Sequence, residues 1–464
     1  MSLASPDGLC SFPNCKELPT VDYKLCDACL GSLCPQHINH PSIGHPCPTH
    51  YGQKWSQEAK ELNANRQVMM FNHLASLAEL DAIYAAEDLR NVECEPDFVP
   101  HLHSIAEWIE WAGSFHLNVP ITFKDGVQWV ARIRCEINSP CGNSRFDLTS
   151  SDLATFIIAH ELAPRYVPQV FLPPRKSPSS LLFYFVELIK SHDIDSPFDP
   201  PMWKRAVRDV AALMAQLSTK SFQGIGSLCF DSKKDIVVGP LHTRHYFHYR
   251  AANLKVYSTS ADSKLALLDH LMLLVRQKKL HWDSQWDGRT GRTRDPVWAY
   301  VMFLEARDII NASVEMNTEQ PTFLRHGDDH LGQFLWKEDG SIAGVVDWES
   351  SSTVPFAEAF NAPTWIHDSD NYHRRGTREN RSNKPTPQEE DLIHELHALD
   401  RQDLANAVRH GRKWHRLDDL LGGNPPGYEG AVGLRRAFNP AADVPASKAE
   451  WVKEATVKFS NYLC

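Results

Sequence analysis

The stretch Phe323–Trp365 reads FLRHGDDHLGQFLWKEDGSIAGVVDWESSSTVPFAEAFNAPTW and decides the fold expected for this chain. It begins with apolar residues, turns tightly at His-Gly-Asp, and continues through a short loop to a hairpin turn at Glu338-Asp339-Gly340. The apolar strand Ile342–Val346 follows and ends at Asp347. This order predicts that Asp328 and Asp347 lie at the mouth of one cleft.

Two carboxylates placed in this way are typical of phosphoryl transfer. One carboxylate orients the acceptor hydroxyl, and the other carries magnesium against the phosphates of the nucleotide. The sequence therefore predicts a phosphotransferase.

The same stretch resembles the catalytic and metal-binding segments of the aminoglycoside phosphotransferase and choline kinase family, a branch of the protein-kinase-like fold, and especially its fungal members. The resemblance implies ATP and Mg²⁺ as cofactors and Asp328 as the group that orients the acceptor hydroxyl. It implies that His326 and His330 support the geometry of the catalytic loop and that Asp347 binds the metal.

One position departs from the family pattern. The family has Asn five residues after the catalytic Asp, as a second magnesium ligand, whereas this chain has Gln333. Gln keeps the amide oxygen but moves it by one methylene, about 1.5 Å. In addition, Asp329 replaces an apolar residue and either helps to hold a cation or faces solvent.

Upstream segments also match the family. Gly113 and Ser114 resemble the hairpin that covers the phosphates, and Arg132 stands where kinase-like enzymes place the lysine that pairs with them. Asp152 stands at the position of its carboxylate partner, and Glu187 ends the strand that enters the adenine-binding hinge. The alternatives are a surface arginine for Arg132 and a helix N-cap for Asp152.

The pattern along the chain predicts an α+β, two-lobed protein-kinase-like fold preceded by a small double-zinc finger. A lobe with a small mixed sheet comes first, because short extended runs surround one helix at about 151–163, and a larger helical lobe follows. We expect its helices at 202–217, 264–278 and 296–313. The predicted divisions are a zinc finger at 1–52, a connecting helix within 53–95, an N-lobe at 96–190 and a helical C-lobe at 191–464. Two polar stretches, at 283–295 and 368–388, are expected to be surface loops that shape the acceptor pocket.

Cysteine and histidine residues are concentrated at the N-terminus. Eight of them have the spacing of zinc ligands, in the order Cys10, Cys15, Cys26, Cys29, Cys34, His37, His45 and Cys47. Eight such ligands predict two closed, structural zinc sites. This series of eight spaced ligands, called the zinc ladder below, resembles the AN-one-type zinc finger. By analogy with cross-braced folds, Cys10, Cys15, Cys34 and His37 would bind one ion and the other four residues the second.

Composition excludes several classes of function. The formal net charge of −10 disfavours binding to nucleic acid or to an anionic membrane and is compatible with a cationic small substrate. No apolar run predicts a signal peptide or a membrane span. We therefore expect a cytoplasmic protein, with the nucleus as the open alternative.

Two functions remain at this point. The first is ATP- and Mg²⁺-dependent transfer of phosphate to a hydroxyl of a small, amine-bearing metabolite. The second is a catalytically weak kinase-like module whose zinc finger recruits a protein partner. Intact Asp328 and Asp347 favour the first function, and Gln333 together with the zinc finger favours the second.

Overall fold

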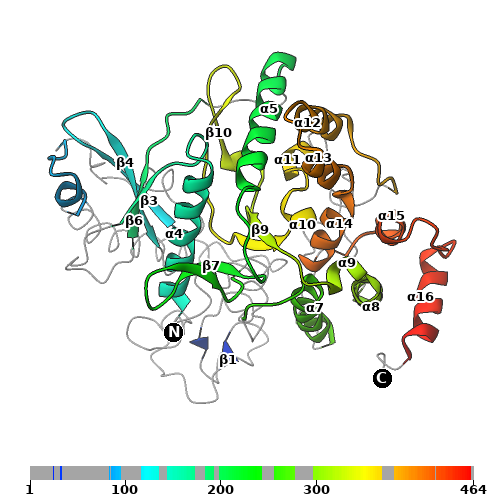
Figure 1. Ribbon diagram of the computed structural model, residues 1–464. Helices are drawn as coiled ribbons and strands as arrows, with labels where there is room; N and C mark the ends of the chain where they lie inside the picture. Colours follow the sequence, from blue (N-terminus) through cyan, green and yellow to red (C-terminus); the bar gives the residue numbers. More distant parts are fainter. Residues whose placement is uncertain are drawn as a thin grey trace, which may run out of the picture. The chain divides into compact units, whose positions relative to one another are not determined.

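The computed structural model (Figure 1) describes two strands near the N-terminus and most of the chain beyond residue 83. The described ranges are 24–25, 32–33, 83, 85–95, 116–134, 144–172, 183–192, 198–242, 255–276, 296–367, 381–423 and 425–460. Contacts divide the chain into two compact units. The sheet unit holds Met1–Leu153 and Pro168–Leu188, and the helical unit holds Ala154–Val167 and Ile189–Cys464. The α+β class is confirmed, while the predicted domain boundaries stay predictions.

The sheet unit contains a four-stranded sheet in the order β3-β4-β6-β5. Its strands are β3 (His116–Thr122), β4 (Gln128–Arg134), β5 (Val170–Phe171) and β6 (Phe183–Glu187). Every described pairing in it is antiparallel, so the prediction of a mixed sheet is wrong. The reason is local, because β3 and β4 are joined by a tight hairpin turn in which Gly126 takes a φ of 83°.

The two faces of this sheet differ in chemistry because side chains alternate along a strand. Trp129, Ala131 and Ile133 point into an apolar core that also contains Phe123 and Phe185. The opposite face carries charged and polar side chains from three adjacent strands, and these are described with the candidate site. Burying charged side chains is costly unless they are paired. The charged side chains on this face are therefore a first indication of a functional role.

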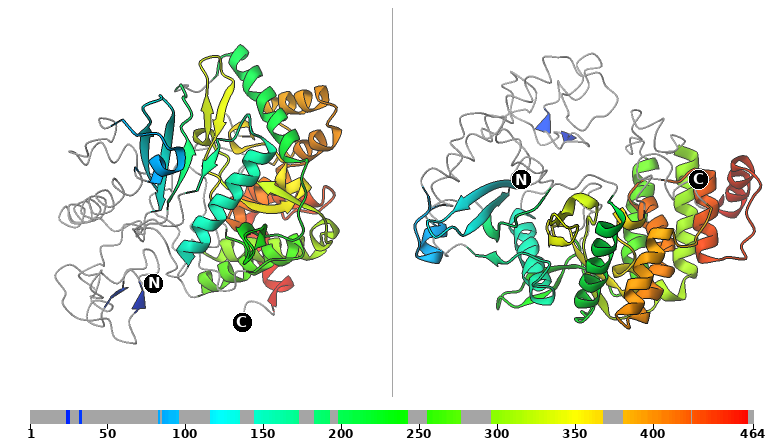
Figure 2. Two further views of the ribbon diagram at one scale, coloured as in Figure 1. Left: turned by 60° about the vertical axis from the view of Figure 1, so that its left-hand side comes forward. Right: turned by 90° about the horizontal axis from the view of Figure 1, so that it is seen from above.

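The helical unit is built on long amphipathic helices. Helix α5 (Pro200–Leu217) begins where Asp199 accepts a hydrogen bond from the N–H of Met202, with prolines in the first turn. This start lies two residues before the predicted one and is a common N-terminal arrangement. In the right-hand view of Figure 2 the helices of this unit stand roughly side by side. They include α7 (Ser260–Arg276), α8 (Pro296–Ala312), α9 (Val314–Asn317), α12 (Pro387–Ala398), α13 (Gln402–Arg409), α14 (Arg412–Leu421), α15 (Tyr428–Phe438) and α16 (Lys448–Lys458).

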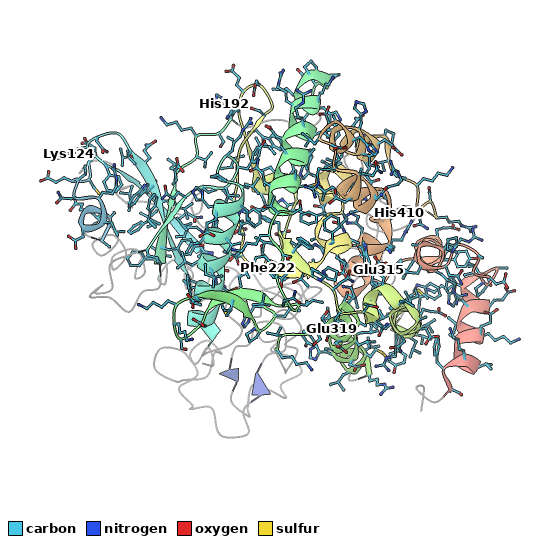
Figure 3. All side chains as sticks on the ribbon, viewed as in Figure 1. Lys124, His192, Phe222, Glu315, Glu319 and His410 are labelled. Carbon is cyan, nitrogen blue, oxygen red and sulfur yellow. The ribbon has the colours of Figure 1, made fainter. Side chains whose placement is uncertain are left out.

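Short antiparallel strand pairs lie beside these helices. They are β7 (Ser227–Phe230) with β8 (Ile236–Gly239), β9 (Thr322–Arg325) with β12 (Ser352–Pro355), and β10 (Phe334–Trp336) with β11 (Ile342–Val345). Phe222 exchanges two backbone hydrogen bonds with Thr322, which fixes the start of β9 to the segment after α5 (Figure 3). The N–H of His192 donates to the carbonyl of Trp336 and fixes β10 in the same way. The predicted hairpin at residues 338–340 is confirmed, with Gly340 at a φ of 83°.

Other predictions fall partly or wholly outside the described residues. The eight zinc-ladder residues and most of the predicted connecting helix lie outside the described residues. In that part of the chain the structure describes β1 (Lys24–Leu25) and β2 (Ser32–Leu33), which pair antiparallel. The predicted helix at 151–163 is α4 (Ser144–Leu162), which begins earlier.

The polar stretch at 368–388 is only partly described. Its end is not a free surface loop, because Asn383 donates to the carbonyl of Gly433 and accepts from Arg416. Among the described residues, no helix is both long and apolar enough to cross a membrane.

Candidate active site

The loop that follows β9 is held in place by His326. The Nδ1 atom of His326 accepts a hydrogen bond from the N–H of Asp328 at 3.1 Å, so the ring proton of the neutral imidazole lies on Nε2. Nε2 then donates to the carbonyl of Val346 at 2.9 Å. One side chain thus ties the backbone of Asp328 to the residue that immediately precedes Asp347. The role of His326 in catalysis stays a prediction.

The backbone around the two carboxylates permits few substitutions. A Cβ at Gly327 would lie 2.4 Å from the carbonyl oxygen of Ser350, so only glycine fits at this close approach. Asp347 itself has a φ of 63° and Ser350 a φ of 60°. A residue with a side chain occupies this left-handed region at a cost of about 1–2 kcal/mol. Such strain tends to cluster at functional sites.

His330 connects the two predicted carboxylates. Its Nδ1 atom accepts from the N–H of Gly332 at 3.0 Å, and its Nε2 atom lies 3.7 Å from Oδ2 of Asp328. The same Nε2 atom lies 3.1 Å from the side-chain amide of Gln333, which in turn contacts Oδ2 of Asp347 at 3.2 Å. The structure therefore brings together Asp328, His330, Gln333 and Asp347, all four of which the sequence singled out.

The amide of Gln333 fits a magnesium ligand. As placed, its nitrogen faces both His330 and Asp347. The nitrogen and oxygen of an amide are nearly isosteric, and hydrogen bonding decides which end faces which neighbour. Because Nδ1 of His330 is already an acceptor, its Nε2 carries the proton and needs an oxygen opposite. A turned amide supplies that oxygen.

The turned amide would also set two oxygens, one from Gln333 and one from Asp347, 3.2 Å apart. Adjacent ligands of octahedral Mg²⁺ are about 3 Å apart, since each bond is about 2.0–2.1 Å long. Carboxylate and amide oxygens are the hard ligands that Mg²⁺ prefers. The added methylene of Gln333 is thus accommodated, because the longer side chain reaches both neighbours.

Asp209 supports the hairpin that leads to Asp347, and sequence reasoning missed it. From α5, its Oδ2 accepts from the N–H of Ile342 at 2.9 Å and its Oδ1 accepts from the hydroxyl of Tyr166 at 3.1 Å. The carbonyl of Tyr166 accepts from the N–H of Val345 at 2.6 Å. Burial, and next the charge of Asp209, raise the pKa of Tyr166 to about 12, so the phenol remains a donor. A buried Asp on an otherwise apolar helix face was the available signal.

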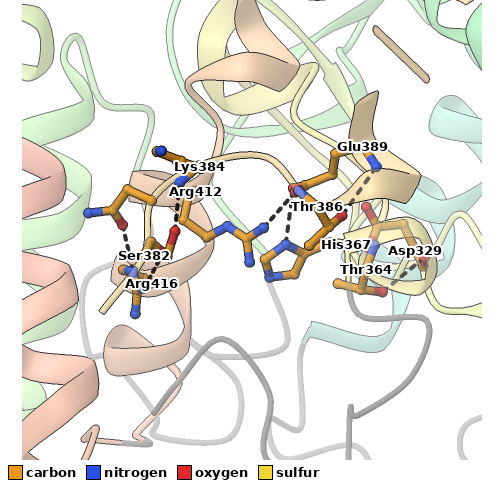
Figure 4. Close-up of polar contacts among 10 residues, drawn as sticks. Asp329, Thr364, His367, Ser382, Lys384, Thr386, Glu389, Arg412 and Arg416 are labelled. Carbon is orange, nitrogen blue, oxygen red and sulfur yellow. Dashed lines mark hydrogen bonds and ion pairs between the residues drawn. The ribbon is translucent and has the colours of Figure 1, made fainter. Parts of the chain in front are cut away.

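Asp329 has a structural partner. Its carboxylate accepts from the N–H of Thr364 at 3.3 Å, and the hydroxyl of Thr364 donates to its carbonyl at 3.0 Å (Figure 4). Thr364 is the first residue of the short helix α11 (Thr364–His367). Asp329 therefore anchors the catalytic loop to α11, and neither of the two roles considered for it describes this contact.

In the sheet unit, the polar sheet face brings Asp152 of α4 to an arginine. Its Oδ2 atom lies 2.6 Å from Nη1 of Arg134 and 3.7 Å from Nε2 of His116, and all three residues are buried. Arg132 lies on the same face two residues earlier, with its guanidinium 3.3 Å from Nδ1 of His116. Sequence reasoning selected Arg132 and overlooked Arg134, which the two-residue period of a strand places on the same face.

The remaining predicted cofactor residues differ in how far the structure describes them. Glu187 is exposed at the end of β6, and its N–H donates to the carbonyl of Gln169. The N–H of Leu188 donates to the carbonyl of Gln128. These two donors are therefore bonded within the sheet unit, and the position of Glu187 at the adenine-binding hinge stays a prediction. Gly113 and Ser114 lie outside the described residues.

Comparison with known proteins adds distant likenesses. No family model matches the chain. The clavilactone A biosynthesis cluster protein Y of Ampulloclitocybe clavipes is 33% identical over 119 residues, which are 24% of this chain and 28% of that protein. The chain thus matches little more than a quarter of this relative's length.

Among solved structures, three similar ones illustrate the range. An ADP-bound aminoglycoside phosphotransferase aligns with a TM-score of 0.37 at 10% identity, covering 74% of this chain and 89% of that one. A type I macrolide 2'-phosphotransferase aligns with a TM-score of 0.39 at 12% identity, covering 79% of this chain and 98% of that one. The ethanolamine kinase of Plasmodium vivax aligns with a TM-score of 0.39 at 10% identity, covering 81% of this chain and 84% of that one. At these scores the likenesses do not assign this chain to a family.

Proposed function

We propose that the protein is an ATP- and Mg²⁺-dependent phosphotransferase that phosphorylates a hydroxyl of a small, amine-bearing metabolite. The observation that carries the proposal is the connected set Asp328, His330, Gln333 and Asp347, with His326 tying the two carboxylate-bearing segments together. An acceptor-orienting carboxylate beside a metal-binding one is what phosphoryl transfer requires.

Asp328 is the group that meets the acceptor. Its side chain is 37% exposed, and that of the adjacent His330 is 48% exposed, so both are open to a small substrate. In the proposed reaction Asp328 accepts a hydrogen bond from the acceptor hydroxyl and takes its proton as the oxygen attacks the γ-phosphorus of ATP. The bond from the γ-phosphorus to the bridging oxygen breaks, and ADP leaves with that oxygen. His330 lies beside Asp328, with its Nε2 atom 3.7 Å from Oδ2 of Asp328.

Asp347 and Gln333 would hold magnesium. The ion neutralises charge on the nucleotide phosphates when it is bound. The left-handed backbone at Asp347, fixed by the close packing of Gly327 on Ser350, sets the position of the carboxylate before any ligand arrives. Asp209 contributes by accepting a hydrogen bond from the N–H of Ile342, which lies five residues before Asp347.

The sheet unit would contribute the phosphate-binding groups. We assign Arg132 to the nucleotide phosphates, with Arg134 and Asp152 forming the buried ion pair that stabilises the polar sheet face. Gly113 and Ser114 would cover the phosphates, and Glu187 would mark the adenine-binding hinge. An amine-bearing acceptor agrees with the excess of acidic residues in the chain.

The N-terminal ladder would hold two structural zinc ions and bind a protein partner in the cytoplasm. Its eight ligands leave no open position for catalysis if they are shared between two tetrahedral sites. The alternative function, a catalytically weak module, draws its support from Gln333, whose amide nitrogen in the present arrangement faces Asp347.

ATP consumption over a panel of small hydroxyl compounds, with and without amines, tests the proposed function. The full chain is assayed with Mg²⁺, and the Asp328→Asn variant is the matched control because it keeps the shape of the side chain. Consumption that depends on one class of acceptor and disappears in the variant supports the proposal. Consumption that is equal in both proteins contradicts it.

A further inference from the structure

A second cluster of histidine and carboxylate groups lies among three helices of the helical unit. His367 ends α11, Glu389 lies in the first turn of α12, and His415 lies in α14. One ring nitrogen from each imidazole and one carboxylate oxygen all lie within 4.8 Å of one another, and all three residues are buried. Figure 4 shows His367 and Glu389 directed toward each other.

The two oxygens of Glu389 have different partners. Oε2 receives the guanidinium of Arg412 and the N–H of Thr386, the latter at 2.6 Å. Oε1 faces Nδ1 of His367 at 3.2 Å. Arg412 and Thr386 thus fix the carboxylate through one oxygen, as outer partners of a metal ligand commonly do. The other oxygen is directed to the histidines.

His415 supplies the observation that points to a ligand. Its ring is only 7% exposed, and its Nε2 atom has no hydrogen-bond partner among the described residues. A buried polar atom without a partner is costly, because it has lost its hydrogen bonds to water.

The spacing and the donor types favour a borderline transition metal. Ligands of tetrahedral Zn²⁺ at bond lengths of about 2.0–2.1 Å lie roughly 3.4 Å apart, close to the 3.2 Å between His367 and Glu389. The two rings stack with centroids 4.0 Å apart and an interplanar angle of 14°. Because the lone pairs lie in the ring planes, binding one ion would require the two rings to tilt out of this stack. Two imidazoles with one carboxylate suit Zn²⁺ better than Mg²⁺ or Ca²⁺, which prefer oxygen.

We propose that His367, Glu389 and His415 form a buried site for one zinc ion. The ion would join α11, α12 and α14, which already meet at Glu389. Because α11 begins at Thr364, which is bonded to Asp329, the site would also steady the catalytic loop. The proposal does not depend on phosphotransfer activity or on the N-terminal ladder.

The zinc content of the full chain tests the site. Wild type and His415→Gln are stripped with a chelator, reloaded with zinc sulfate and freed of unbound metal. His410→Gln is the matched control, because His410 is exposed at the end of α13 (Figure 3). We expect His415→Gln to hold one zinc fewer than wild type and the control to hold the same number. The difference is independent of any zinc held by the N-terminal cysteines. A difference below about half an ion per chain overturns the proposal.

Hydrogen exchange on the wild-type chain keeps the proposal testable if His415→Gln does not fold. Added zinc should slow exchange in peptides covering α11, α12 and α14. Peptides covering the β3–β4 hairpin, in the other unit, serve as the internal control. Exchange in α14 that zinc leaves unchanged overturns the proposal, whatever zinc does elsewhere in the chain.

Discussion

The helical unit contains two sets of histidine and carboxylate groups, and their surroundings differ. In the catalytic loop, Asp328 and His330 are 37% and 48% exposed. In the cluster of α11, α12 and α14, the side chains of His367 and Glu389 are 7% and 2% exposed. The first set is oxygen-rich and open to substrate, whereas the second is nitrogen-rich and closed. Similar residue types therefore suit magnesium-dependent chemistry in one place and a structural role in the other.

The largest expected effect concerns the open set. Asp328→Asn should lower turnover by ~10²–10⁴, because it removes the group that takes the proton from the acceptor. The affinity for ATP should stay near that of wild type, since the variant does not alter Asp347. Steady-state kinetics together with nucleotide titration check both statements. A loss of ATP affinity as large as the loss of turnover would contradict the assigned role.

A comparable change in the closed set should act on stability instead. Glu389→Gln leaves Arg412 buried without its charged partner, and breaking such a pair typically costs about 3–5 kcal/mol. Glu390→Gln is the matched control, because the neighbouring side chain is exposed. Urea denaturation in the presence of a chelator measures both variants. Equal midpoints for the two variants would show that the buried pair contributes nothing.

The support of the catalytic hairpin can be tested at Asp209. In Asp209→Asn the amide oxygen can still accept from the N–H of Ile342, but the amide nitrogen then faces the hydroxyl of Tyr166, whose proton loses its acceptor. A mismatched buried hydrogen bond costs about 1–3 kcal/mol. We expect a fall in stability of this size and weaker binding of Mg-ATP, because β11 positions Asp347. A variant that is destabilised but binds Mg-ATP normally would remove Asp209 from the support of the site.

The smallest effect is expected for Gln333→Asn. The shorter amide restores the ligand length of the family pattern but loses reach toward His330, so we expect activity to rise modestly or to change less than about tenfold. Mg²⁺ dependence of the rate is the measurement. If the variant abolishes activity, the glutamine has another role, and its assignment as a metal ligand is wrong.

The catalytic loop could be predicted because its chemistry is local in sequence. The turn at Gly327, the hairpin at Gly340 and the strand before Asp347 all follow from short patterns. The partner of Asp152 was harder to find. Arg132 and Arg134 lie on one strand face, and the strand pattern alone does not indicate that Arg134 contacts the carboxylate of Asp152.

The buried cluster could not be predicted from the sequence. His367, Glu389 and His415 come from three helices, and no spacing rule joins residues so far apart. A partial signal was present in Thr386 and Glu389, which form a capping box at the start of α12. That pattern predicts where the helix begins but not that Glu389 also accepts from Arg412.

Binding of Mg-ATP to wild type and to Asp347→Asn tests the central claim most directly. Asn tolerates the left-handed backbone at residue 347 almost as well as Asp does, so the variant removes charge with little change in strain. Mg-ATP at a hundred times its dissociation constant should stabilise the wild-type protein by ~2.7 kcal/mol, and the variant should lose this gain. Equal stabilisation of both proteins, or none in wild type, would contradict the claim that Asp347 holds the metal of a phosphotransferase.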